Sequence, residues 1–164
     1  MSDCRSSRRW SPRQLRWLMR AYPPLLFQRI QVLEIDPGFR RAVVRVRRSI
    51  FSRNLQGSTF GGTIYAAVDP FHALMLWQIC AHEDIRVQAW MKEAVITFLR
   101  PADSHLTIEF SLDDRTVVDA LRAIRETGRF AHVFEVQALD EQGTVCAAVR
   151  TDIRILWPQR NSTN

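Results

Sequence analysis

The chain has 164 residues, of which 46% are hydrophobic, so it is long enough for one domain with its own core. No apolar run reaches the roughly 18 residues that a membrane span needs, and we therefore predict no membrane span. The three cysteines form no C-x-x-C pair, which argues against a disulfide framework and against a structural zinc site.

The formal charge is +6, and only Lys92 among the 23 basic residues is a lysine. Twelve of the basic residues fall within residues 1–48, against three acidic ones. Such a surface would suit the phosphates of nucleic acid, anionic lipid or coenzyme A, but a solvated face with a basic tail is the more ordinary interpretation. No nucleic-acid-binding motif accompanies the charge, so we predict no nucleic-acid partner. No secretory signal is recognisable, and we expect a cytoplasmic protein.

The first ten residues are polar, and we expect a loose basic tail over 1–10. Ser11 followed by Pro12 is typical of a helix start, with serine as the N-cap, and Pro23-Pro24 is expected to end that helix. Further on, Asp36-Pro37-Gly38 is a turn signal between two extended segments and predicts a hairpin.

Residues 61–82 are apolar on most sides, as expected for a helix that is buried against a sheet. Pro70 inside this segment removes a hydrogen bond and should kink the helix. The later segments alternate between apolar and polar residues, which indicates antiparallel strands. The complete prediction is helices over 12–22, 61–82 and 114–127, and strands over 29–35, 41–50, 90–100, 105–112, 130–139 and 144–157.

These elements predict an α+β fold in which an antiparallel sheet packs on one long central helix. The sequence contains no internal repeat and no linker, so we predict a single domain over residues 11–158. Residues 159–164 are expected to form a short tail.

The residues with the clearest chemistry are a glycine pair, Gly61-Gly62, and a carboxylate, Asp69, that follows eight residues after Gly61. Within a helix this separation corresponds to about 12 Å of rise. The first amides of a helix lack partners and favour negative charge, so they could stabilise an oxyanion while Asp69 acts as base or nucleophile.

Each of these residues also has an ordinary structural interpretation. Aspartate followed by proline is a typical helix N-cap pair, so Asp69 could simply cap a helix. Gly61 and Gly62 could serve only close packing of the backbone. Asn54 could orient a water molecule or close a turn with its side chain.

Two further side chains, His72 and Lys92, carry similar alternatives. His72 lies three residues after Asp69 on nearly the same helix face, but a histidine of the core is the more ordinary interpretation. Lys92 could pair with Asp69 or bind a phosphate, or it could form a plain salt bridge.

Asp69 and His72 have no obvious third ligand near them, so we predict no metal site. The sequence has no G-x-S-x-G elbow, Walker loop or dinucleotide fingerprint, and we predict no cofactor.

The stretch N-L-Q-G-S-T-F-G-G over residues 54–62, together with Asp69, resembles the N-x-x-G-x-x-H-G-G…D pattern of acyl-CoA thioesterases of the phenylacetate-pathway type. The chain is still more similar to an uncharacterised, thioesterase-like hotdog family that is known only as a domain of unknown function. Members of that family carry stretches similar to residues 22–24, 34–37, 60–66 and 69–71, and to the strand that contains Lys92 and ends at 98–101. The resemblance covers residues 15–157.

The resemblance implies the hotdog fold and a thioester hydrolase acting on an acyl-CoA or related thioester. It implies that Gly61, with Gly62 beside it, polarises the thioester carbonyl, that Asp69 is the base or nucleophile, and that Asn54 positions substrate or water. It also implies a homodimer or a dimer of dimers with active sites between protomers. The remaining residues that we expect to contact substrate are Phe60, Thr63, His72, Lys92 and Arg100, the last at the coenzyme phosphates.

Two positions depart from the pattern of those enzymes. Phe60 stands where they have the histidine of H-G-G, which removes a polar contact to the thioester and extends an apolar wall. Pro70 directly follows the carboxylate and could shift Asp69 relative to the glycines. A non-catalytic module that binds acyl chains or lipids is therefore the alternative function.

Overall fold

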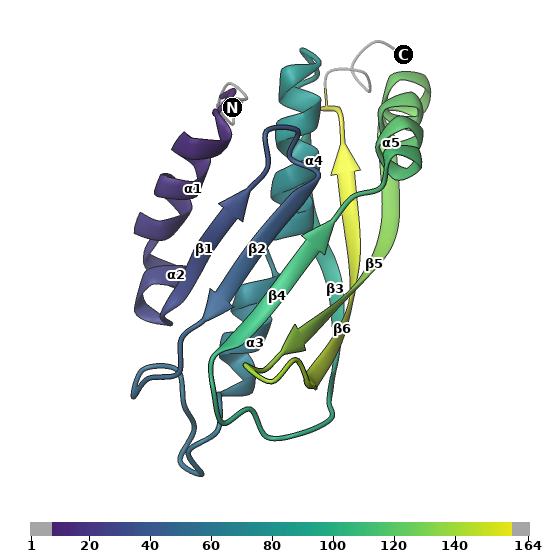
Figure 1. Cartoon of the computed structure of the whole chain (residues 1–164). Helices are drawn as coiled ribbons and strands as arrows, with labels where there is room; N and C mark the ends of the chain where they lie inside the picture. The colour runs from purple at the N-terminus through teal and green to yellow at the C-terminus, as the bar shows by residue number, and fades with distance from the viewer. Residues whose placement is uncertain (1–7, 159–164) are drawn as a thin grey trace.

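One curved, six-stranded antiparallel sheet wraps around two consecutive helices, which confirms the predicted α+β fold (Figure 1). The structure is a computed structural model and describes residues 8–158. The helices are α1 (Pro12–Ala21), α2 (Pro23–Phe27), α3 (Gly61–Val68), α4 (Phe71–His82) and α5 (Asp114–Thr127). The strands are β1 (Ile30–Ile35), β2 (Arg41–Val46), β3 (Gln88–Phe98), β4 (Leu106–Ser111), β5 (Arg129–Leu139) and β6 (Val145–Leu156).

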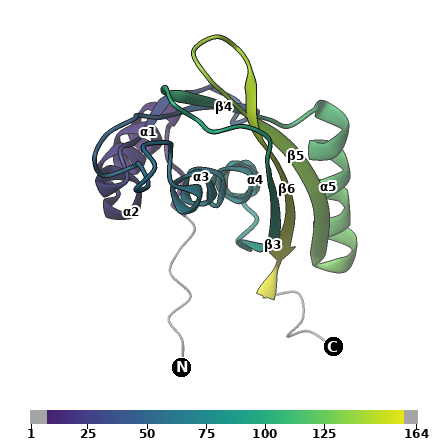
Figure 2. The ribbon, with the colours of Figure 1, turned by 90° about the horizontal axis from the view of Figure 1, so that it is seen from below.

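The strand order in the sheet is β1-β2-β4-β5-β6-β3, so β1 and β3 are its two edges. Helices α3 and α4 lie on the concave side of the sheet, and α5 lies outside it, next to β5 (Figure 2). Apolar residues of the strands and of α4 meet on the concave side and form the hydrophobic core. Most faces of α4 are therefore buried, as its apolar sequence predicts.

The start of the chain differs from the prediction in one respect. Ser11 caps α1 as expected, because its hydroxyl accepts a hydrogen bond from the amide of Gln14, and the Gln14 side chain accepts one from the amide of Ser11. The first helix ends before Pro23 as predicted, but Pro23 also begins a second, short helix, α2, which was not predicted. Proline is tolerated in the first turn of a helix, where its missing amide would have no partner.

The second predicted strand is shorter than expected. It ends at Val46, and residues 47–60 form turns that lead to α3. The hydroxyl of Ser52 donates to the carbonyl of Arg47 at 2.6 Å, and Arg53 pairs with Thr59 in an isolated bridge. These local hydrogen bonds compete with the ladder of the sheet and bend the chain away from it.

The predicted long helix is divided in two at Asp69 and Pro70. The amide of Asp69 still donates to the carbonyl of Tyr65 at 3.0 Å, and the amide of Leu74 donates to the carbonyl of Pro70 at 2.8 Å. Both Asp69 and Pro70 keep right-handed helical angles. Proline has no amide hydrogen, so the interruption follows directly from the sequence.

Part of the predicted N-terminal tail is held against the domain. The side chain of Gln78 on α4 accepts a hydrogen bond from the amide of Trp10 and donates one to the carbonyl of Arg8. The remainder of that tail, 1–7, and the predicted tail over 159–164 lie outside the described residues. Within 8–158, no helix combines the length and apolarity that crossing a membrane would require.

The core contains an unusual polar residue, His72, which is only 2% exposed. Its ring stacks on Phe134, with centroids 4.1 Å apart, and meets the edge of Phe110 at 5.2 Å. No described residue hydrogen-bonds its Nδ1 atom. Burial lowers the pKa of His72 from 6.5 to about 3, and the nearby His132 adds to this shift. His72 is therefore a neutral, aromatic core residue at physiological pH.

We expect His72 to make the fold sensitive to acid. Below pH 6.5 the unfolded chain binds a proton at His72, whereas the folded chain does not until about pH 3. The contribution of His72 to the free energy of unfolding is therefore most favourable above pH 6.5. It decreases as the pH drops toward 3, by at most about 1.4 kcal/mol per pH unit. Urea denaturation of the wild type and of a His72→Phe variant between pH 7 and pH 5 measures the effect. The stability of the wild type should fall more steeply, while an exposed control, His82→Gln, should follow the wild type. Parallel curves for the wild type and His72→Phe would contradict the expectation.

Candidate functional site

The first turn of α3 presents backbone amides that are free to bind an acceptor. Phe60 is the N-cap, with an extended backbone and no side-chain cap. Its carbonyl accepts hydrogen bonds from the amides of Thr63 and Ile64. The amides of Gly61 and Gly62 form no hydrogen bond with another described residue. Free amides at a helix start carry partial positive charge and favour an anion or a polarised carbonyl oxygen.

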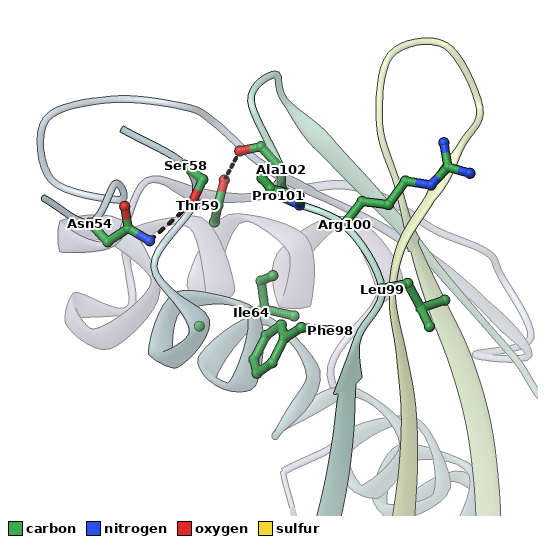
Figure 3. A pocket seen from close by; sticks show the side chains of 10 residues that line it. Asn54, Ser58, Thr59, Ile64, Phe98, Leu99, Arg100, Pro101 and Ala102 are labelled. Atoms are coloured by element: carbon green, nitrogen blue, oxygen red, sulfur yellow. Dashed lines mark hydrogen bonds between the residues drawn. The ribbon is translucent and has the colours of Figure 1, made fainter. Parts of the chain in front are cut away.

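Gly61 lies in the wall of a pocket of about 380 Å³ between the loop before α3 and the end of β3 (Figure 3). The amide and hydroxyl of Thr59 both donate to the carbonyl of Ala102, at 2.9 and 3.2 Å, and these bonds fasten the two walls together. The other lining residues are Asn54, Ser58, Ile64, Phe98, Leu99, Arg100 and Pro101.

The side chain of Asn54 closes a turn, which is one of the two roles that the sequence suggested for it. Its Nδ2 donates to the hydroxyl of Ser58 at 2.9 Å, and its Oδ1 accepts from the amide of Gln56 at 3.0 Å. The side chain therefore closes the turn that precedes α3. It still lines the pocket of Gly61, so the turn also positions it there.

Two aromatic rings pack closely on the glycine pair. A Cβ atom on Gly61 would lie 2.8 Å from the Cζ atom of Phe98, and one on Gly62 would lie 2.4 Å from the Cε1 atom of Phe60. Both rings are exposed on their other sides. Glycine at these positions therefore lets the rings lie over the start of the helix. Phe60, which replaces the histidine of the thioesterase pattern, forms one of these two aromatic contacts.

Asp69 lies at the junction of α3 and α4, away from the pocket of Gly61. It lines a second pocket, of about 600 Å³, formed by α1, α4 and β3. The lining is mainly apolar and aromatic, and its other members are Leu18, Met19, Tyr22, Pro70, Ala73, Leu74, Trp77, Ala89, Trp90 and Met91.

The Asp69 carboxylate has no partner within residues 8–158, neither a hydrogen-bond donor nor a cation. Its backbone is helical rather than extended, and α4 has no side-chain cap, so Asp69 does not act as an N-cap. Although the residue as a whole is exposed, desolvation by its apolar neighbours raises the pKa of its carboxyl group above the ordinary 3.8. An unpartnered carboxylate of raised pKa is suited to accept a proton.

The other predicted residues are dispersed. Thr63 is buried in the core, as is His72, and neither lines either pocket. The Nζ atom of Lys92 lies 3.9 Å from an oxygen of Asp152 on β6, so Lys92 forms the plain salt bridge. Arg100 lines the pocket of Gly61, but its side chain extends away from Asn54 (Figure 3).

Within one chain, the first pocket thus unites Gly61, Asn54 and Arg100, and Asp69 stands alone in the second. Sequence reasoning missed the aromatic lining of the second pocket, namely Tyr22, Trp77 and Trp90. Tyr22 directly follows α1, Trp77 is on α4 and Trp90 is on β3, so they have no common spacing and only the packing of these segments reveals them. Among the described residues, no group of three or more His, Cys, Asp or Glu side chains is placed to hold a metal ion.

Similar folds are known from solved structures. A Pseudomonas aeruginosa protein of unknown function, described as a probable thioesterase, is 20% identical, with a TM-score of 0.76 over 88% of this chain and 95% of that one. A Haemophilus influenzae thioesterase is 14% identical, with a TM-score of 0.67 over 92% and 93% of the two chains. The PaaI protein of the E. coli phenylacetic acid degradation operon is 18% identical, with a TM-score of 0.59 over 86% and 89%.

No curated protein matches the chain by sequence. The sequence of residues 12–156, by contrast, matches a family that is described as a domain of unknown function, DUF4442. This match spans every helix and strand of the structure, and the solved structures above share their arrangement. The chain therefore belongs to the DUF4442 family and has the hotdog fold of thioesterase-like proteins.

Proposed function

We propose that this protein is a thioester hydrolase that acts on an acyl-CoA or a related thioester. The observation that carries the proposal is the Asp69 carboxylate, which lacks any described partner and has a raised pKa beside an apolar pocket. The free amides of Gly61 and Gly62 at the start of the same helical segment supply the complementary group. Similarity to proteins described as thioesterases supports the same reaction.

In the proposed reaction, the amide of Gly61 donates a hydrogen bond to the thioester carbonyl oxygen. The helix start stabilises the negative charge that develops on this oxygen as the carbonyl carbon is attacked. Asp69 takes a proton from the attacking water, the carbon–sulfur bond breaks, and the thiolate leaves and is protonated. The products are a carboxylic acid and a free thiol. In the alternative route Asp69 attacks directly, and water then hydrolyses the resulting anhydride.

The separation of Gly61 and Asp69 supports an active site that is shared between two protomers. Eight residues of helix place them about 12 Å apart along the axis, and they line different pockets. The β3 edge carries exposed apolar side chains, including Trp90, Val95 and Phe98, and such a surface is typical of an interface. We propose that the protein forms at least a homodimer through this region, in which Gly61 of one protomer faces Asp69 of its partner.

The two pockets would then hold different parts of the substrate. The apolar and aromatic lining around Asp69 suits the acyl group, because burial of apolar surface favours binding. The pocket of Gly61 has Arg100 at its wall and suits the polar carrier, with the guanidinium available to a phosphate.

The Phe60 side chain favours a second candidate function, a module that binds acyl chains or lipids without cleaving them. Phe60 packs against Gly62, where the thioesterases of similar sequence have a histidine. An aromatic ring at this place provides apolar contact but no hydrogen bond to a thioester. Retention of an acyl-CoA by the wild type without release of free thiol would establish this function in place of hydrolysis.

We expect an Asp69→Asn substitution to abolish most of the hydrolysis. The amide cannot accept the proton of water, so kcat should fall by roughly 100-fold or more. The measurement is the release of free thiol from acyl-CoA thioesters of increasing chain length, with oligomeric state and melting temperature as checks. Asp119→Asn, on the outer helix α5, is the matched control and should leave the rate unchanged. Equal rates for the wild type and Asp69→Asn would rule out Asp69 as base or nucleophile.

The pH profile of the wild type provides an independent check. A general base must be ionised, so kcat/KM should fall as the pH drops through the pKa of Asp69. Because desolvation raises that pKa, the acidic limb should lie above pH 3.8. A flat profile across the acidic range in which the protein stays folded would contradict this role.

We expect a Gly61→Ala substitution to impair hydrolysis through Phe98. The added methyl group would meet the Phe98 ring at 2.8 Å, and displacement of the ring or of the helix start should lower kcat by roughly 10- to 100-fold. A Gly61→Ala/Phe98→Ala double variant that keeps the wild-type oligomeric state should recover much of the rate, since the collision is removed. Gly38→Ala, which meets only ordinary contacts, serves as the control. Failure of the double variant to recover would show that Phe98 is not the cause.

A further inference from the structure

The end of the molecule formed by the loop before α3 carries four strongly exposed apolar side chains. They are Phe27 at the end of α2, Ile50 and Phe51 in the first turn after β2, and Leu55 at the tip of the next turn. We call these four residues the apolar tips. Leu55 is fully exposed, at 108% of its reference area, and Phe27 is 73% exposed. The loop extends beyond the end of the sheet (Figure 1).

The apolar tips are exposed and do not contribute to the hydrophobic core, so contacts within the chain do not account for apolar residues at these positions. Single exposed apolar residues are common, but several at one end of a molecule mark an interaction surface. The guanidinium of Arg29 lies 5.0 Å from the ring centre of Phe51. The end of α2, which carries Phe27, and the turn that carries Ile50 and Phe51 therefore lie side by side. The hydrogen bonds of Ser52 and Asn54 hold the two turns in shape. The tips are thus presented by an ordered loop.

Five arginines accompany the tips, and we call them the arginine collar. They are Arg29, Arg45, Arg47, Arg48 and Arg53, all exposed. None of them forms an ion pair with a residue of 8–158. The sequence from residue 42 to residue 68 contains no acidic residue. The acidic residues on neighbouring loops are Asp103, in the loop after β3, and Asp140 and Glu141, in the turn between β5 and β6.

We propose that the apolar tips and the arginine collar dock this protein on the surface of an anionic lipid bilayer. Apolar side chains enter the boundary between headgroups and acyl chains, while the arginines remain at the level of the anionic headgroups. Each basic residue near such a surface strengthens attachment through the negative surface potential. The two kinds of side chain on this loop match those two layers of a membrane.

The charge of the collar disfavours a second copy of the chain as the partner. A symmetric contact through this surface would bring five arginines against five arginines, and like charges across an interface oppose association. The shape also favours lipid, because the tips are on a protruding loop rather than in a groove, and a fluid bilayer adapts to protruding side chains.

Docking in this manner would bring the pocket of Gly61 close to the membrane. Asn54, Ser58 and Thr59, which line that pocket, belong to the same loop as Ile50, Phe51 and Leu55. A substrate or ligand with a long acyl chain would then reach the pocket from the bilayer. The docking itself does not require thioester hydrolysis and can be tested apart from it.

The test is co-sedimentation of the full chain with vesicles of phosphatidylcholine, alone or mixed with phosphatidylglycerol, at low and high salt. We expect binding to the anionic vesicles, weaker binding at high salt because the charges are screened, and little binding to phosphatidylcholine alone. An Arg47→Gln/Arg53→Gln variant should bind roughly 25-fold more weakly, at about 5-fold for each arginine. A Phe51→Ser/Leu55→Ser variant should lose roughly 10-fold or more.

Matched controls separate docking from general effects. Arg13→Gln/Arg86→Gln removes two exposed arginines elsewhere that form no ion pair with a described residue, and Val118→Ser removes an exposed apolar side chain on α5. Both controls should bind vesicles like the wild type, and all variants should keep the wild-type melting temperature. The proposal is overturned if the wild type does not bind anionic vesicles, or if tip and collar variants bind as well as the controls. It is also overturned if tip variants change only the oligomeric state in sedimentation velocity, since the loop would then be an interface between copies.

Discussion

The burial of α4 against the concave face of the sheet is the constraint on which the rest of this structure depends. Nearly every face of α4 is covered, so even His72 is held neutral between aromatic rings. A charged group on such a helix is tolerated only where the helix meets solvent. The interruption before Phe71 provides that place, and Asp69 occupies it with one helical segment on either side. Proline at position 70 thus interrupts the hydrogen bonds of the helix next to Asp69, which is exposed and lines a pocket.

Much of the fold follows from local rules and was predictable for that reason. The capping box of Ser11, the turn at 36–38 and the left-handed Gly128 after α5 all depend on residues close in sequence. The insertion of β4 between β2 and β5, and the edge position of β3, depend on contacts between distant segments and left no local signal. The short helix α2 and the early end of β2 were missed because proline and serine are each compatible with two local structures.

The candidate site shows the same division. Gly61-Gly62 and Asp69 were the strongest signals in the sequence. Within residues 8–158, the amide of Gly61 and the carboxylate of Asp69 have no hydrogen-bond partner, and desolvation raises the pKa of Asp69. Spacing gave their separation along the helix but not that they line different pockets, because each pocket is completed by other elements, α1 for Asp69 and the end of β3 for Gly61. The sequence identifies which residues have reactive or hydrogen-bonding groups. Which residues surround them depends on how distant strands and helices pack together. His72 illustrates the point, since helical spacing places it on nearly the same helix face as Asp69, whereas packing buries it in the core. Thr63, expected to contact substrate, is buried as well.

The distribution of arginine along the chain has a structural meaning that composition alone does not convey. Arg41 joins Glu34 and Glu109 in a network across β1, β2 and β4, and its charge is thereby compensated on the sheet surface. A few residues further on, Arg45 lies opposite Gln31 on β1 and Thr107 on β4, and no carboxylate within residues 8–158 forms an ion pair with Arg45, Arg47 or Arg48. Five arginines without an ion-pair partner in residues 8–158 therefore accompany the apolar tips at this end of the molecule. A surface that only contacts water explains the exposed arginines but not the exposed Phe51 and Leu55. Burial in a hydrophobic core would explain the apolar residues but not the arginines. Both together are accounted for by a partner that is apolar inside and anionic at its surface.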